Sequence, residues 1–150
     1  MKFRLLRVLV VGLLLVSILA GCAPAGAPVL NIEGAWGRPS PTMPTAAGVY
    51  MLIKNTGTVS DTLLSGKSPA CGSIEVHEMA MKADGTMGMN LVEKPLEIPA
   101  GGQVELKVGG LHIMCIMRND EVFKPGAMVE LTLTFEKSGE KTVSVEVREK

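Results

Sequence analysis

The sequence predicts an all-β fold, a sandwich of two sheets. Short runs of alternating apolar and polar residues recur along the chain, and an alternation of period two is typical of half-buried strands. Gly, Pro, Asp and Asn separate these runs at the short spacing that sandwiches and barrels show. Helical periodicity does not persist beyond about two turns in any window, which argues against a fold with crossover helices.

Nine runs are expected to form strands, each bounded by turn residues. In chain order they cover residues 30–36, 48–55, 61–67, 73–81, 86–92, 103–108, 111–117, 128–136 and 141–149. Turn residues cluster between them, at 55–57, 83–85, 99–102 and 137–140. The segment 37–46 holds three prolines, and proline cannot donate a sheet hydrogen bond, so we expect a loop that covers the domain.

The first 21 residues are expected to be a lipoprotein signal peptide. Three basic residues precede an apolar run of twelve residues, 8–19, which is too short to span a bilayer. The run ends in Leu-Ala-Gly-Cys, so Cys22 is the expected lipidated residue. The alternative is an ordinary signal peptide cut near Ala20.

The remaining chain divides into an anchor with a tether, 22–30, and a single domain, 31–150. Removal of residues 1–21 takes away three of the 15 basic residues and none of the 15 acidic ones, which leaves a net charge of −3. Such a mildly acidic domain has no basic stripe for nucleic acid.

Two further cysteines, Cys71 and Cys115, leave two outcomes open. An oxidising compartment favours a disulfide between them. The apolar neighbours of Cys115 favour a buried core thiol instead, and this is the outcome we expect. There is no Cys-x-x-Cys motif to support a thioredoxin-type site or a zinc knuckle.

The segment 75–90 combines one histidine with four methionines. If residues 83–85 form a three-residue turn with Gly85 in the left-handed conformation, the turn sets the register of a hairpin. The expected cross-strand pairs are Lys82–Thr86, Met81–Met87 and Met79–Met89. His77 then shares a face with the two methionine pairs, whereas a two-residue turn would shift the register and break this arrangement.

A second group follows the same rule, because His112, Met114 and Ile116 share a face while Cys115 points away. Methionine is often a flexible core filler, and this is the competing interpretation. Six of the nine methionines after residue 21 lie between 79 and 117, and each histidine has a methionine two residues later. We therefore favour ligands over core filling, with Met81 and Met87 as supporting packing.

Imidazole and thioether donors, with no evident carboxylate among them, suit Cu(I) better than Mg²⁺, Ca²⁺ or Zn²⁺. Thioethers also survive mild oxidants better than thiolates do. Because a histidine ligand must be neutral, we expect Cu(I) binding to weaken as the pH falls through a histidine pKa near ~6.5.

The pattern resembles the signature of the PCu(A)C periplasmic copper chaperones. That signature falls on His77, Met79, Met89, His112 and Met114. Met87 shares a face with Met89 and is an alternative ligand to it. The surrounding stretches AWGRPSP, VHEM and IPAGGQVELKVGGLHIM also resemble the family.

The resemblance implies a Greek-key, cupredoxin-like β-sandwich over residues 31–150 that binds Cu(I) and is not an enzyme. It implies delivery of copper to the binuclear copper site of cytochrome c oxidase, with the copper-site subunit as a partner and a Sco-type thiol protein beside it. The expected location is extracytoplasmic and lipid-anchored through Cys22, which is the periplasm in a cell with two membranes.

Two other functions compete with this one. A blue-copper electron carrier needs two histidines, a cysteine and an axial methionine, but here no histidine follows Cys115 and strand alternation separates it from His112. A metal-free surface lipoprotein with a methionine-rich core is the other alternative. An enzyme is disfavoured, since no nucleophile and base are paired in the sequence.

Overall fold

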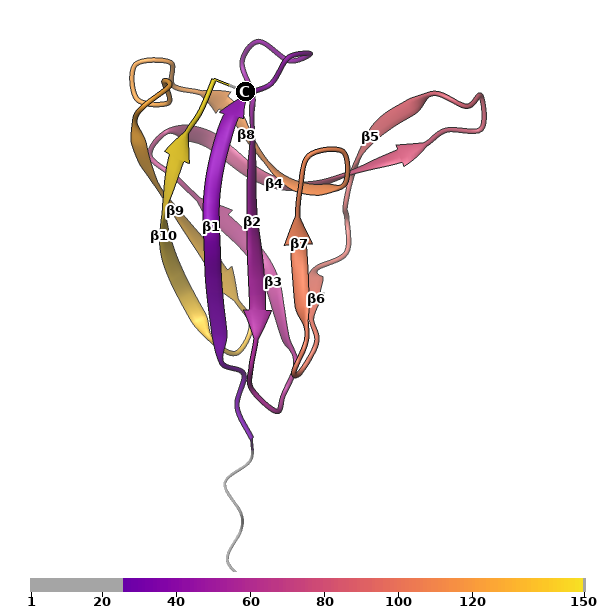
Figure 1. Cartoon of the computed structure of the whole chain (residues 1–150), viewed down its shortest axis with the longest axis vertical. Helices are drawn as coiled ribbons and strands as arrows, with labels where there is room; N and C mark the ends of the chain where they lie inside the picture. Colours follow the sequence, from indigo (N-terminus) through magenta and orange to yellow (C-terminus); the bar gives the residue numbers. More distant parts are fainter. Residues whose placement is uncertain (1–25, 150) are drawn as a thin grey trace, which may run out of the picture.

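The computed structural model describes residues 26–149, so the expected signal peptide and Cys22 lie outside the described residues. The described chain consists of strands joined by turns (Figure 1). The strands are β1 (Leu30–Pro39), β2 (Ala47–Asn55), β3 (Asp61–Lys67), β4 (Cys71–Met81), β5 (Met87–Leu91), β6 (Leu96–Ile98), β7 (Gln103–Leu106), β8 (Leu111–Arg118), β9 (Met128–Phe135) and β10 (Gly139–Val147). Within residues 26–149, no helix is long and apolar enough to cross a bilayer.

All nine predicted strands are confirmed, with two differences. β6 was not predicted; it has only three residues, too few for an alternating pattern to stand out. β1 also continues beyond residue 36, because it pairs with β2 as far as Pro39, which lies opposite Ala47. The proline-rich loop is therefore shorter than expected and begins at Ser40.

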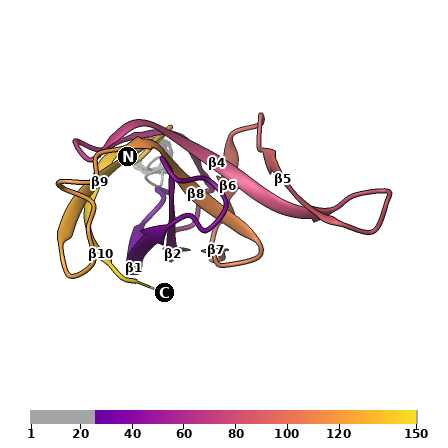
Figure 2. The same cartoon turned by 90° about the horizontal axis from the view of Figure 1, so that it is seen from above.

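One continuous sheet takes the place of the two separate sheets that we expected. Its strand order is β5-β4-β8-β2-β1-β10-β9-β3-β6, with β7 attached to β2. β1 and β10 pair in parallel. The sheet curls until β3 packs against β4, so that two halves of the same sheet enclose the core (Figures 1 and 2).

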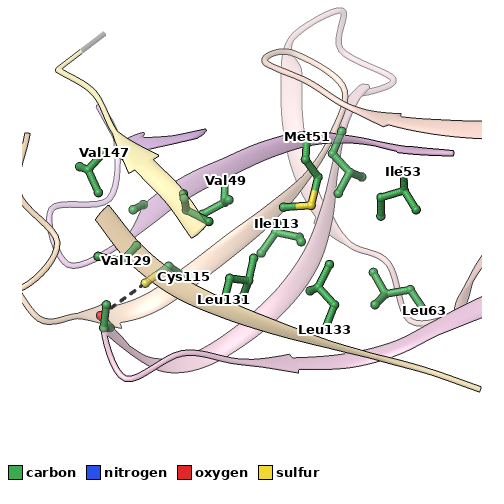
Figure 3. Packing of buried hydrophobic residues seen from close by; sticks show 14 of the residues in the cluster. Val49, Met51, Ile53, Leu63, Ile113, Cys115, Val129, Leu131, Leu133 and Val147 are labelled. Carbon is green, nitrogen blue, oxygen red and sulfur yellow. Dashed lines mark hydrogen bonds between the residues drawn. The ribbon is translucent and has the colours of Figure 1, made fainter. Parts of the chain in front are cut away.

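The core lies between these halves and is built by strand alternation. Val49, Met51 and Ile53 of β2 point inward with Ile113 of β8, and they meet Leu133 of β9 (Figure 3). Complete burial of an aliphatic side chain contributes roughly 1.5–3 kcal/mol. The residues that alternate with them on β2, such as Gly48 and Tyr50, consequently lie on the outer side of the sheet.

Cys71 and Cys115 form a disulfide, which corrects our expectation of a buried free thiol. β4 and β8 are neighbours, and the Cα atoms of Cys71 and Cys115 lie 5.3 Å apart, a distance that a disulfide spans. The disulfide lies against the core, where Cys115 is fully buried. The contact of its sulfur with the Ala70 carbonyl in Figure 3 is van der Waals, because a disulfide sulfur carries no proton.

Two buried polar side chains stabilise the end of the curled sheet that is distant from the disulfide. Asn55 is 1% exposed. Its side-chain oxygen accepts the N–H groups of Val29 and Gly57, and its side-chain nitrogen donates to the carbonyls of Val59 and Ile98. Asp61 is fully buried and accepts backbone N–H groups of Thr62, Lys137 and Ser138. Part of the expected tether is also ordered, since the Val29 carbonyl accepts the N–H of Thr56 at 2.9 Å.

Candidate metal centre

The hairpin of β4 and β5 has the register that its turn predicts. Gly85 has a φ of 81°, the left-handed conformation that this turn requires. The Lys82 N–H donates to the Thr86 carbonyl at 2.8 Å, and the Asp84 carboxylate accepts the Thr86 N–H at 2.9 Å. Met81 consequently lies opposite Met87 and Met79 opposite Met89, as expected.

The second group of predicted ligands lies on β8, which runs beside β4. His77 lies directly opposite His112, and Glu75 lies directly opposite Met114. These side chains are on the outer face of the sheet, because their neighbours Ile113 and Val76 face the core. Met114 is only 1% exposed, yet it is not part of the main core cluster. Met114 therefore lies outside the main core, and the structure places all five predicted ligands on neighbouring strands with their side chains on one face of the sheet.

His112 is fixed in the form that a metal ligand needs. It is 4% exposed, and its Nδ1–H donates to the Gly110 carbonyl at 2.8 Å, which leaves the Nε2 lone pair free. Burial lowers the pKa of His112, and repulsion from His77 lowers it further, against the opposing effect of the Gly110 hydrogen bond. The neutral, ligand-competent imidazole is therefore favoured.

His77 is oriented through its other nitrogen. Its Nε2–H donates to the Glu75 carboxylate at 2.8 Å, while Nδ1 is buried and has no hydrogen-bond partner. A carboxylate that holds one imidazole nitrogen while the other faces a metal is a recurring arrangement in metal sites. The expectation that no carboxylate accompanies the donors was wrong: Glu75 lies two residues before His77 on the same strand face, which is the signal that could have identified it.

The donors line a groove of about 240 Å³ at the outer face of the sheet. Met79, Met89, His112 and Met114 form one side; Arg38, Ser40, Pro41, Thr42, Gly48 and Tyr50 are among the residues that form the rest. Residues 40–42 of the proline-rich loop thus line this groove. A Cβ on Gly48 would collide with the end of the Tyr50 side chain, so the small residue at position 48 leaves room for the Tyr50 ring in this wall. His77 does not line the groove and approaches from beside it, with its ring centroid 6.2 Å from that of His112.

The outer methionine pair does not support packing, which corrects that expectation. Met81 is 73% exposed and Met87 is 52% exposed, whereas Met79 and Met89 are half-buried. Met87 also lies two residues from Met89 along β5, on the side of the hairpin turn, and does not line the groove. The geometry therefore favours Met89 over Met87 as the ligand.

A row of rings extends from the donors across the sheet. The centroids of Tyr50 and His112 are 6.2 Å apart, and those of Trp36 and Tyr50 are 4.6 Å apart. The guanidinium carbon of Arg148 lies 5.0 Å from the Trp36 ring centroid. These contacts stiffen the wall behind His112.

The blue-copper interpretation does not fit this geometry. It requires a cysteine thiolate beside the histidines, but Cys115 is bound in the disulfide. Cys115 is also on the core face of β8, opposite to the face that carries His112 and Met114. Within residues 26–149, the predicted ligands on this face of the sheet therefore carry imidazole and thioether groups and no thiolate.

Comparison with known proteins places the chain among lipoproteins and PCuAC domains. Residues 30–147 match the family described as "Putative lipoprotein LpqE-like". The chain is also 31% identical to the "Putative lipoprotein Lxx21020" of Leifsonia xyli subsp. xyli, over 97% of this chain and 91% of that protein.

Solved structures of similar fold are PCuAC domains. The copper-bound PCuAC domain from PmoF2 is 27% identical, with a TM-score of 0.64 over 81% of this chain and 93% of that one. The solution structure of CuI-DR1885 from Deinococcus radiodurans is 26% identical, with a TM-score of 0.61 over 87% of this chain and 82% of that one. These neighbours confirm the cupredoxin-like β fold.

Proposed function

Because the chain belongs to the LpqE-like lipoprotein family and has the fold of copper-binding PCuAC domains, we propose that it is an extracytoplasmic Cu(I)-binding metallochaperone. It carries the ion as cargo and catalyses no reaction. The family supports a lipid-anchored location outside the cytoplasm, and Cys22 is the residue that we propose carries the lipid.

One observation carries the proposal: His77 and His112 lie directly opposite each other on the outer face of the sheet, next to the Met79–Met89 pair. The buried Nδ1 of His77 lacks any partner, and an unsatisfied buried nitrogen costs about 1–3 kcal/mol unless something binds it. A soft cation at this nitrogen removes that cost.

The proposed ligands are His77 through Nδ1 and His112 through Nε2, with thioether sulfurs from Met79, Met89 and Met114. Glu75 holds His77 in its tautomer, and the Gly110 carbonyl holds His112 in the complementary one. Thioethers and imidazoles select Cu(I) over harder divalent ions. They bind without a thiolate, so the ion can be released to a recipient whose thiolates bind it more strongly.

An anaerobic titration against a coloured Cu(I)-selective chelator tests this function. The wild-type domain should withdraw one equivalent of Cu(I), and a His77→Ala, His112→Ala double variant should withdraw far less. A matched control is Glu78→Ala, Asn90→Ala, because these exposed residues pair on the opposite face of the same hairpin. If the histidine variant competes as well as wild type and the control, the proposed site is wrong.

X-ray absorption on the loaded domain provides a second test, since the Cu(I) neighbours should include both nitrogen and sulfur. Neighbours of oxygen alone would contradict the ligand set. A measurement that does not depend on the chelator is useful here, because chelators can form mixed complexes with a partly open site.

We propose that the recipient is the copper-site subunit of cytochrome c oxidase, together with a Sco-type thiol protein, in the periplasm where the cell has two membranes. The support is the signature residues and the groove that opens them to a partner. Mixing the loaded domain with the apo copper-site domain of the oxidase should move Cu(I) to the latter. If copper stays with the chaperone even when the Sco-type protein is added, this recipient is excluded.

A further inference from the structure

The methionine face of the β4–β5 hairpin continues beyond the groove. The hairpin projects from the body of the domain as an arm (Figures 1 and 2). On this arm Met81 lies directly opposite Met87, one step further out than the Met79–Met89 pair on the same face. Residues two apart on a strand are roughly 7 Å apart, so four thioethers form two successive pairs.

Exposure rises steadily along this series. Met114 is 1% exposed, Met79 and Met89 are half-buried, and the outer pair reaches 52% for Met87 and 73% for Met81. The outer pair therefore contributes little to core packing, and both of its side chains are open to solvent. A single exposed methionine is normal on a protein surface. Here two exposed methionines face each other and continue the row of predicted ligands, so their placement needs an explanation.

The opposite face of the arm keeps positive charge away from these sulfurs. Ala80, Lys82 and Gly88 share that face, and the Lys82 side chain lies along the space that a Cβ on Gly88 would fill. Lys82 thus covers the back of the arm. At the tip, the Asp84 carboxylate is already engaged by Thr86. The methionine face consequently offers thioether donors to a soft cation without a competing ammonium group.

We propose that Met81 and Met87 form an outer, weaker Cu(I) site through which the ion passes to and from the inner site. This inference rests on the proposed copper-chaperone function. Copper remains Cu(I) throughout: the sulfur lone pairs of the outer pair bond to the ion as ligands of the donor molecule leave, and then Met79 and Met89 replace the outer sulfurs. No proton moves in either exchange, since a thioether carries none.

The outer site is weaker because two exposed thioethers act without an imidazole and compete with water. It fills only after the inner site or transiently during transfer. Because Met81 and Met87 are exposed near the end of the arm while His112 and Met114 are buried, a copper donor contacts the outer site first.

Methyl NMR with ¹³C-labelled methionine tests binding at the outer pair, with Cu(I) supplied anaerobically as its acetonitrile complex. The first equivalent should shift the methyl signals of Met79, Met89 and Met114, and an excess should then shift those of Met81 and Met87. Outer signals that stay in place under excess Cu(I) overturn the proposal.

Stopped-flow transfer from a coloured Cu(I)–chelator complex tests passage. The variant is Met81→Leu, Met87→Leu, which keeps the apolar bulk and removes the sulfurs. The matched control is Met117→Leu, Met128→Leu, whose parent residues are 66% and 61% exposed and lie off the arm. The outer-pair variant should load about tenfold more slowly than the control, with an equilibrium affinity within about twofold of wild type.

Equal loading rates for the two double variants overturn the passage route. That result would leave the chaperone function standing, because the function depends on the affinity lost in the His77→Ala, His112→Ala variant. Conversely, if that histidine variant binds Cu(I) as wild type does, the chaperone function fails whatever the loading rates are.

Discussion

Removal of the disulfide should destabilise the domain by an amount that follows from its position in the chain. Cys71 and Cys115 are 44 residues apart. A cross-link that closes a loop of this length lowers the entropy of the unfolded chain by about 13 cal/mol/K, which corresponds to about 4 kcal/mol near room temperature. Small domains have a free energy of unfolding of about 5–15 kcal/mol, so this loss is a large part of the total.

The variant for this test is Cys71→Ala, Cys115→Ala, because a serine would place an unpaired hydroxyl at the fully buried position 115. Urea unfolding of the variant and of wild type should give free energies that differ by about 4 kcal/mol. Wild type with a reducing agent is the control, since it loses the cross-link without losing side-chain atoms. A difference below about 1 kcal/mol in both comparisons would refute the entropic reasoning, because the native domain would then not depend on the cross-link.

Three further changes have distinct expected outcomes. Glu75→Gln removes the charge that holds His77, so chelator competition should show a Cu(I) affinity about 10–100-fold lower. Gly85→Ala forces a Cβ into a φ of 81°, which should cost about 1–2 kcal/mol in urea unfolding and also weaken Cu(I) binding by disturbing the hairpin register. Asp61→Asn should cost about 2 kcal/mol at neutral pH. Burial raises the pKa of Asp61, but hydrogen bonds from Ser138, Lys137 and Thr62 outweigh it and lower the pKa below 3.8. The stabilisation by Asp61 is therefore present above pH ~4 and is lost as the pH falls through the lowered pKa, so wild type and variant should converge in acid.

Each of these changes has a matched control. Glu78→Gln removes an exposed carboxylate from the opposite face of the same strand, and an equal loss of affinity there would show that Glu75 acts only through net charge. Gly101 also has a positive φ, 64°, and a Cβ added there would meet only open space. Gly101→Ala should lower stability without changing Cu(I) affinity. A variant of Asp61 that stays less stable than wild type by the same amount at pH ~2 would contradict the role of its ionised form.

The parts of the fold that depend on neighbouring residues could be predicted from the sequence. The register of the β4–β5 hairpin depends on the three-residue turn at 83–85, whose conformation follows from Gly85. Strand alternation likewise places His112 and Met114 together and Cys115 away from them. Once the turn is known, both methionine pairs follow.

The parts of the fold that depend on strand order could not be predicted from the sequence. Nothing local in the sequence states that β8 lies between β4 and β2, and the disulfide and the opposition of His77 to His112 both follow from that order. Alternation also assigns a side chain to a face without saying what covers that face. Met81 and Met87 were expected to be packed for this reason, but the loop at 40–42 reaches only the inner pair.

The row of aromatic and imidazole rings behind the site links tryptophan fluorescence to copper binding. Trp36 is the one tryptophan of the chain, and Tyr50 alone stands between it and His112 in this row. An ion bound at His112 alters the electronic surroundings of the row, so the fluorescence of Trp36 is expected to change with occupancy. The domain therefore carries its own emission reporter, with which copper exchange can be followed at low concentration and without a coloured competitor.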